Sequence, residues 1–131
     1  MQLKFNTRDP VYMQVIRYFK TQIATGVLEP GEEIPSRREI ANMFKINPNT
    51  AQRAYKEMEE QGLIRTERNF PSKITRDESV IQHVREELVV TAVNDFVDAI
   101  KPVNVPLDEL LDLVKQKYAG ADDQKGGALD D

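Results

Sequence analysis

The sequence predicts a mainly helical fold with a small β-hairpin, in which three N-terminal helices and the hairpin are followed by two C-terminal helices. Three observations lead to this prediction. Apolar residues recur at helical spacing in five segments, several of these segments begin with capping signals, and two short runs after the third segment favour strands. A chain of 131 residues can hold one modest core with a small appendage.

The first helix is expected to begin at Asp9-Pro10, with Asp9 as the cap and Pro10 at the first helical position. Its apolar residues share one face and are Tyr12, Val15, Ile16, Phe19 and Ile23. Gly26 ends this helix. The Pro30-Gly31 pair that follows is typical of a type II turn, in which glycine takes the positive φ angle.

Two further helices are separated by a tight turn. Ser36 and Glu39 form a capping box for the first of them, and Asn47 caps the second with Pro48 at its first position. The apolar face of the second helix contains Ala51, Ala54, Tyr55 and Met58, and its opposite face contains Asn49, Gln52, Arg53 and Lys56. A short helix, a turn and a longer helix with a polar, basic outer face form the layout of a DNA-binding helix-turn-helix.

The runs 63–67 and 72–75 predict a β-hairpin after Gly62. Arg68-Asn69-Phe70-Pro71 connects them, although Pro71 limits strand pairing and no glycine supplies a tight turn. Three helices and such a hairpin make a winged helix-turn-helix, which we assign to residues 1–76.

Residues 77–118 are expected to form a helical dimerisation region. A long helix over 77–101 carries a broad apolar stripe, and Pro106 opens a second helix. Because this second helix is too short to cover the stripe, we expect a partner copy to bury it; an intrachain core and a ligand pocket remain alternatives. The expected interface residues are Ile81, Val84, Leu88, Val89, Ala92, Val93, Phe96, Val97, Ile100, Leu110, Leu111 and Val114. Residues 119–131, rich in Gly and Asp, are expected to be a disordered acidic tail.

The composition excludes several classes of protein. The chain has no cysteine and one histidine, His83, so we expect no disulfide frame, no His-rich metal site and no cofactor. No apolar run approaches the length of a membrane span and no signal peptide is visible, which predicts a cytoplasmic protein. No catalytic constellation or Gly-rich phosphate loop occurs, so an enzyme is not expected.

The net charge of −4 conceals an asymmetry. Residues 1–76 carry 13 Lys and Arg against 9 Asp and Glu, a net of +4. Residues 77–131 carry 5 against 13, a net of −8. The basic part is the part with the predicted helix-turn-helix, as phosphate neutralisation requires.

Four motifs occur in order along the chain: Pro10-Val-Tyr-Met-Gln, Gly26-x-x-x-Pro-Gly, Ile34-Pro-Ser-x-Arg-Glu-Ile-Ala and Glu59-x-x-Gly-Leu-Ile. Together they resemble the GntR family of bacterial transcription regulators, and Asn47-Pro-Asn-Thr with Arg53-Ala-Tyr resembles its YtrA-type subfamily. The resemblance implies a homodimer that reads an inverted-repeat operator in double-stranded DNA. It also implies repression, often of the regulator's own operon, which in this subfamily frequently encodes an ATP-binding-cassette transporter.

Candidate DNA-contacting residues come from the polar face and from matching family positions. They are Ser36, Arg37, Arg38, Asn47, Pro48, Asn49, Thr50, Gln52, Arg53, Lys56, Arg68 and Asn69. We expect Gln52 and Asn49 to read bases, because their amides can pair with adenine edges, and Arg53 and Lys56 to contact phosphates. Many family members carry Arg where Pro48 stands, and a Gly-x-Gly-Thr wing where this chain has Asn69-Phe70-Pro71-Ser72.

Two alternative functions differ in their partners. A winged helix can serve as a protein-interaction module without sequence-specific DNA binding, but the positive charge of residues 1–76 favours DNA. A ligand-gated switch would need a small-molecule effector, which the sequence does not identify. A crevice at the dimer interface would be its place.

Overall fold

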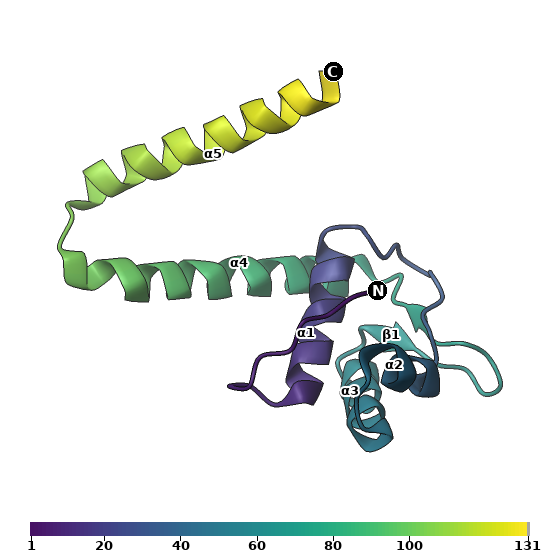
Figure 1. Ribbon diagram of the computed structural model, residues 1–131. Helices are drawn as coiled ribbons and strands as arrows, with labels where there is room; N and C mark the ends of the chain where they lie inside the picture. The colour runs from purple at the N-terminus through teal and green to yellow at the C-terminus, as the bar shows by residue number, and fades with distance from the viewer. Residues whose placement is uncertain (131) are drawn as a thin grey trace. The chain divides into compact units, whose positions relative to one another are not determined.

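The computed structural model describes residues 1–130, with side chains as far as Ala121. The chain divides into two compact units, Met1–Val90 and Thr91–Asp131. The first unit contains helices α1 (Val11–Ala24), α2 (Arg37–Phe44) and α3 (Pro48–Glu60), strands β1 (Ile64–Arg65) and β2 (Lys73–Ile74), and the start of α4 (Glu78–Ile100) (Figure 1). The second contains the rest of α4, the 3₁₀ turn η1 (Lys101–Val103) and α5 (Leu107–Asp130). The described residues therefore form a mainly helical fold with one two-stranded antiparallel sheet, as predicted.

Helix α1 begins at Val11, and the start predicted for it was wrong in detail. Pro10 occupies the cap position and no side chain caps the helix. The chain that enters the helix is held instead by Gln14, which is buried. Its Nε2 donates to the carbonyl oxygens of Asn6 and Asp9 at 3.0 and 2.8 Å, and its Oε1 accepts from the Asn6 N–H at 2.9 Å. A buried amide with all these bonds satisfied fixes the N-terminal segment against α1.

The capping predictions for α2 and α3 are confirmed. The Ser36 hydroxyl accepts from the Glu39 N–H at 3.1 Å, and the Glu39 carboxylate accepts from the Ser36 N–H at 3.2 Å. The Asn47 side chain accepts from the Asn49 N–H at 2.8 Å, with Pro48 at the first helical position. Lys45 ends α2 in the left-handed conformation, with φ of 54°, and so turns the chain sharply toward α3.

The hairpin forms, but its strands are two residues long rather than the four or five predicted. Ile64 pairs with Ile74 and Arg65 with Lys73. At the tip, the Phe70 N–H donates to the Glu67 carbonyl at 3.0 Å, and Asn69 takes φ of 68°. Asn therefore fills the position for which the sequence offered no glycine, because its side chain tolerates the left-handed region.

The segment before α2 supports the other edge of the hairpin. Gly31 has φ of 80° in a turn closed by the Glu32 N–H donating to the Glu29 carbonyl at 3.0 Å, which confirms the predicted type II turn. Beyond the turn, the Ile34 N–H donates to the Ser72 carbonyl at 3.0 Å, and Glu33 forms a bridge with Lys73. β2 is consequently bonded on both sides.

The core of the first unit lies between α1, α2, α3 and the apolar face of the hairpin. Ring contacts join the helices: Phe19 meets Tyr55 edge to face at 6.0 Å, and Tyr18 meets Phe44 at 5.5 Å. The buried apolar residues are Val15, Ile16, Phe19, Ile23, Leu28, Ile34, Ile40, Ala41, Phe44, Ala51, Ala54, Tyr55, Met58, Leu63, Ile64, Ile74, Ile81 and Val84.

The first turns of α4 belong to this core, so the interface predicted for two of its residues needs correction. Ile81 and Val84 are only 3% and 2% exposed, because they pack within the winged-helix unit. They are therefore unavailable to a partner chain. For the same reason the compact unit extends to Val90 instead of ending near residue 76.

The second unit contains the remaining predicted helices. α4 ends at Ile100, η1 contains Pro102, and Asn104 takes φ of 61° before α5 begins just after Pro106. The helix α5 extends past residue 118, where the sequence analysis ended it. Side chains after Ala121, and Asp131 entirely, lie outside the described residues, so the expected disorder of 119–131 stays a prediction.

Candidate nucleic-acid interface

The outer face of α3 and the start of α2 present most of the polar residues singled out from the sequence. Pro48 and the Asn47 cap set the direction of α3, while Ala51, Ala54, Tyr55 and Met58 bury its other face. Two members of the predicted set are half-buried, Arg37 and Thr50. The others are exposed: Ser36, Arg38, Asn47, Pro48, Asn49, Gln52, Arg53, Lys56, Arg68 and Asn69.

Arg37 connects α2 with α3 through both ends of its guanidinium group. Its Nη1 donates to the side-chain oxygen of Gln52 at 2.7 Å, and its Nη2 donates to a Glu59 carboxylate oxygen at 2.7 Å. The same Glu59 oxygen accepts from the Thr66 hydroxyl at 2.8 Å, and Thr66 also bonds the buried Ser72. Arg37 was predicted to contact phosphate, whereas here these two nitrogens serve internal bonds.

Arg53 is also held by its neighbours. Its guanidinium carbon lies 3.7 Å from the centre of the Tyr12 ring, and Nη2 donates to the Tyr12 hydroxyl at 3.0 Å. A looser ion pair joins Nε to Glu57 at 3.6 Å, one turn further along α3. A cation over an aromatic face is stabilised by the ring quadrupole, so Tyr12 keeps Arg53 on the surface shared by α1 and α3.

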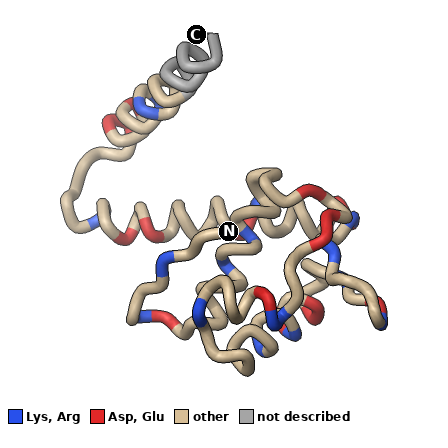
Figure 2. Tube along the Cα trace, turned by 45° about the vertical axis from the view of Figure 1, so that its right-hand side comes forward, with Lys and Arg blue, Asp and Glu red and all other residues tan. Residues whose placement is uncertain are grey.

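Three other cations on this side carry no ion pair with any residue whose side chain is described. Arg38 lies in the first turn of α2, Lys56 on α3, and Arg68 at the tip of the hairpin. Figure 2 shows Lys and Arg distributed over the winged-helix unit. Positive side chains without acidic partners, beside a helix N-terminus, favour contact with phosphate groups.

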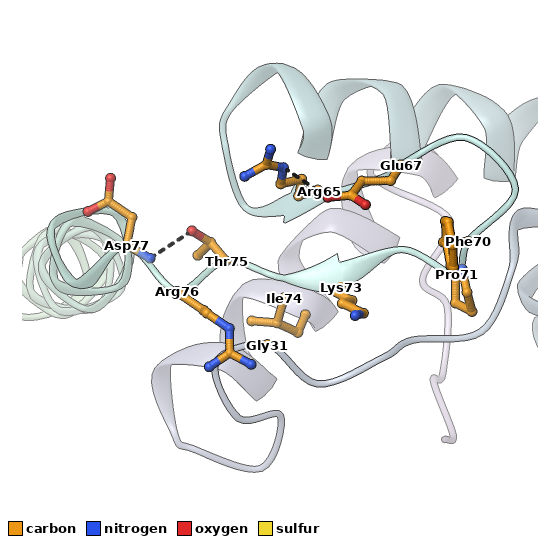
Figure 3. Close-up of a pocket in the computed structure, with 10 residues that line it drawn as sticks. All are labelled: Gly31, Arg65, Glu67, Phe70, Pro71, Lys73, Ile74, Thr75, Arg76 and Asp77. Carbon is orange, nitrogen blue, oxygen red and sulfur yellow. Dashed lines mark hydrogen bonds and ion pairs between the residues drawn. The ribbon is translucent and has the colours of Figure 1, made fainter.

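A hollow of about 470 Å³ lies along the hairpin, on the side of Gly31 and Arg76 (Figure 3). The Arg76 guanidinium lies directly against Gly31, where a Cβ atom would meet it at 2.4 Å. Arg65 and Lys73 add positive charge, and the Arg65 guanidinium is 3.9 Å from Glu67. The hairpin therefore adds a second basic surface to the one on α2 and α3.

A buried tyrosine fixes the chain just before the capping box. The Tyr55 hydroxyl donates to the Pro35 carbonyl oxygen, and the ring is 1% exposed. Burial raises the pKa of Tyr55 well above its ordinary value, the nearby Glu39 carboxylate raises it further, and Arg37 lowers it. Tyr55 thus joins the core of α3 to the start of α2, the segment that carries Arg37 and Arg38.

The sequence analysis missed three residues that organise this face: Tyr12, Glu59 and Thr66. Tyr12 was assigned to the apolar side of the first helix, although its hydroxyl is a polar group at the helix start. Glu59 follows Gln52 by seven residues, and this spacing places both on one face of a helix. That periodicity was available in the sequence; the partner of Thr66 required the fold.

Most of the predicted dimer-interface residues lie on exposed surface of the isolated chain. Leu88 packs partly against the winged-helix core, and Ile100 and Leu110 are half-buried. The exposed members are Val89, Ala92, Val93, Phe96, Val97, Leu111 and Val114. In the second unit, an apolar crevice of about 470 Å³ is lined by Phe96, Ile100, Leu110, Leu113, Val114, Lys117, Tyr118 and Ala121.

Two kinds of feature are absent from the part of the chain that the structure describes. It contains no group of three His, Cys, Asp or Glu side chains that could hold a metal ion. It also contains no helix long and apolar enough to cross a membrane.

Comparison with known proteins places this geometry in a family. Residues 11–73 match the gntR family of bacterial regulatory proteins. The chain is 30% identical over 115 residues to the HTH-type transcriptional regulator YhcF of Bacillus subtilis, covering 88% of this chain and 95% of the relative. It is 29% identical over 132 residues to the HTH-type transcriptional repressor YtrA of the same organism, covering 100% and 99%.

Structural comparison agrees with the sequence. A GntR family transcriptional regulator from Listeria monocytogenes superposes with a TM-score of 0.78 at 30% identity, over 86% of this chain and 98% of that protein. The relatives are transcription regulators, not enzymes. With its winged helix-turn-helix and this full-length similarity, the chain belongs to the GntR family of DNA-binding transcriptional regulators and is similar to its YtrA-type members.

Proposed function

We propose that this protein is a dimeric, sequence-specific repressor of transcription that binds an inverted-repeat operator. The observation that carries the proposal is the outer face of α3, where the exposed amides of Asn47, Asn49 and Gln52 adjoin the cations Arg38 and Lys56. Amide side chains at the start of a helix are suited to base edges in the major groove, and flanking cations are suited to phosphates.

Affinity and sequence preference would come from different residues. Arg38, Lys56 and Arg68 lack acidic partners within the described part of the chain, and Arg53 is directed by Tyr12. These four cations from each protomer would supply phosphate contacts, and two protomers together would make about 6–10 of them. Such a complex loses on the order of 10³–10⁵ in affinity between about 50 and 200 mM salt.

Dimerisation would be supplied by the second unit. Val93, Phe96 and Val97 on α4 are 51%, 41% and 43% exposed, and Leu111 on α5 is 46% exposed. Contiguous apolar side chains of this size on an isolated chain are typical of an interface. A two-fold dimer would present two α3 helices to two half-sites and would therefore require an inverted repeat.

Repression is supported by the full-length similarity to a protein named as a transcriptional repressor. A dimer that covers a promoter would act by excluding polymerase, which needs no further chemistry from the protein. We extend the proposal to the operon that encodes the protein, because the family resemblance implies that many members regulate their own genes.

Selection of binding sites from a random duplex pool by the purified protein tests this function. One enriched inverted repeat would support a dimeric sequence reader, and its half-site spacing would give the separation of the two α3 helices. A pool with no enriched motif, together with binding that does not depend on salt, would contradict the proposal. It would then favour a module that binds a protein partner.

A further inference from the structure

The structure contains one contact that bears on which base pair the protein would recognise. Gln52 lies on the exposed face of α3, and its Oε1 accepts a 2.7 Å hydrogen bond from Arg37 Nη1. Gln52 Nε2 makes no hydrogen bond with any residue whose side chain is described. The amide is thus engaged on its acceptor side and free on its donor side.

Chemistry determines which end of the Gln52 amide faces Arg37. A guanidinium group has five N–H donors and no acceptor, so only the amide oxygen can pair with it. The opposite orientation would place the amide N–H groups against a cation that also only donates. The NH₂ group of Gln52 must therefore be the end that is left for another partner.

Arg37 is itself fixed, so the amide is oriented before DNA arrives. The second guanidinium nitrogen is held by Glu59 at 2.7 Å, and both side chains are about one-third exposed. Glu59 also accepts from Thr66, which bonds the buried Ser72 beneath the hairpin. A planar, bidentate arginine held in this way positions its partner more firmly than a single flexible contact would.

We propose that Arg37 is a specificity-determining residue, which makes Gln52 read a base acceptor, the O6 or N7 of guanine or the O4 of thymine. Pairing with adenine requires one amide donor and one amide acceptor together, and the acceptor of Gln52 is occupied. This inference rests on the proposed function, because it concerns the base read by the same α3 face. It replaces the adenine pairing that the sequence alone suggested for Gln52.

Asn47 and Asn49 make a useful comparison on the same helix. Asn47 uses its side-chain oxygen to cap α3, accepting from the Asn49 N–H at 2.8 Å, and so also offers only donors. The Asn49 side chain makes no hydrogen bond with the described residues and keeps both functions. Of the three amides, Asn49 is the one suited to adenine.

The test uses the selected operator and duplexes that carry every single base-pair change across one half-site. The position that Gln52 reads is the one at which Gln52→Ala abolishes discrimination. There the wild-type protein should prefer guanine or thymine over adenine by on the order of tenfold. Arg37→Ala should release the amide oxygen and shift that ratio toward adenine by a similar factor.

Arg38→Ala is the matched control, since it removes the same charge from the adjacent residue. It should weaken binding to all duplexes alike and leave the base ratio unchanged. Gln52→Glu retains an acceptor for Arg37 but presents no donor, so it should transfer preference to cytosine, whose N4 amino group donates. This second variant strengthens the contact with Arg37 and does not depend on the stability of Arg37→Ala.

Three results would overturn the inference: wild-type preference for adenine at that position, an unchanged ratio in Arg37→Ala, or no position that responds to Gln52→Ala. A selection that enriches no motif is a different outcome, because it overturns the proposed function first and this inference with it.

Discussion

At the scale of single residues, the DNA-facing surface is built from side chains that hold one another. Arg53 lies over the Tyr12 ring and bonds its hydroxyl, so the cation is oriented by a residue from another helix. A pre-oriented cation loses less side-chain entropy when it meets a phosphate. The contact therefore matters for affinity more than for the fold.

Arg53→Ala should weaken binding to cognate and scrambled duplexes by the same factor and reduce the salt slope by about 1, because it removes one phosphate contact. Tyr12→Phe retains the ring and removes only the hydroxyl, so its loss of affinity should be smaller. Dissociation constants measured for both duplexes across a salt series check this. A loss confined to the cognate duplex would show that Arg53 reads a base.

Tyr55 gives the protein a pH dependence of its own. Because burial raises its folded pKa above that of the unfolded chain, the unfolded state releases the proton first. The stability that this group contributes is complete below about pH 10, its unfolded value, and is lost as the pH rises toward the folded pKa.

The free energy of unfolding should therefore fall above about pH 10 by up to about 1.4 kcal/mol per pH unit from this group. Tyr55→Phe should remove that part of the slope, at a cost of about 1 kcal/mol at neutral pH for the lost hydrogen bond to Pro35. Urea unfolding of both proteins between pH 8 and 11, as a rough range, measures the difference. Parallel curves for the two proteins would show that Tyr55 does not ionise in this range.

At the scale of elements, α2 and α3 are the parts whose ends are determined by local chemistry. The reciprocal bonds of Ser36 and Glu39 satisfy two backbone or side-chain donors at the start of α2, and this same turn presents Arg37 and Arg38. Losing the cap should therefore affect both the stability of α2 and the position of its arginines.

Ser36→Ala should destabilise the protein by about 1 kcal/mol, because the Glu39 N–H loses its acceptor. Ser36→Gly should cost only a few tenths of a kcal/mol, since glycine is well tolerated at a helix cap. Denaturant titrations compare the two at one pH. Equal stability of Ser36→Ala and wild type would show that the capping box contributes nothing measurable.

At the scale of the whole molecule, charge and apolar surface are distributed unequally along the chain. Residues 1–76 have a net charge of +4 and residues 77–131 a net charge of −8. The acidic part includes the exposed apolar residues of α4 and α5. This distribution is expected if one part binds DNA and the other binds a second copy of the chain.

Substituting Val93 and Phe96 together by Glu should prevent dimerisation, because each protomer would then bury charge in an apolar interface. Analytical ultracentrifugation measures the mass, and circular dichroism reports whether the helices persist. The double variant should also bind the inverted repeat far more weakly than wild type while still binding non-specific DNA. Thr91→Glu and Asn94→Glu, exposed polar positions on the same helix, provide a control of matched charge. A double Val93 and Phe96 variant that remains dimeric would place the interface elsewhere.

The sequence by itself determined the helices, their caps and the family, because these depend on neighbours within a few residues. Ser36 with Glu39, Asn47 with Pro48, and Pro30 with Gly31 were all readable as local patterns, and each formed as predicted. The hairpin was readable in outline, although its length and the left-handed Asn69 depended on the pairing of β2 with residues 31–34.

Only the tertiary structure decided what the polar side chains on those elements contact. The bonds of Arg37 to Gln52 and Glu59, and of Arg53 to Tyr12, join residues 15, 22 and 41 positions apart, which no local pattern specifies. Packing likewise assigned Ile81 and Val84 to the core, because an apolar stripe on a helix does not reveal which surface covers it. Local chemistry sets the elements, while long-range packing decides which side chains stay free to bind.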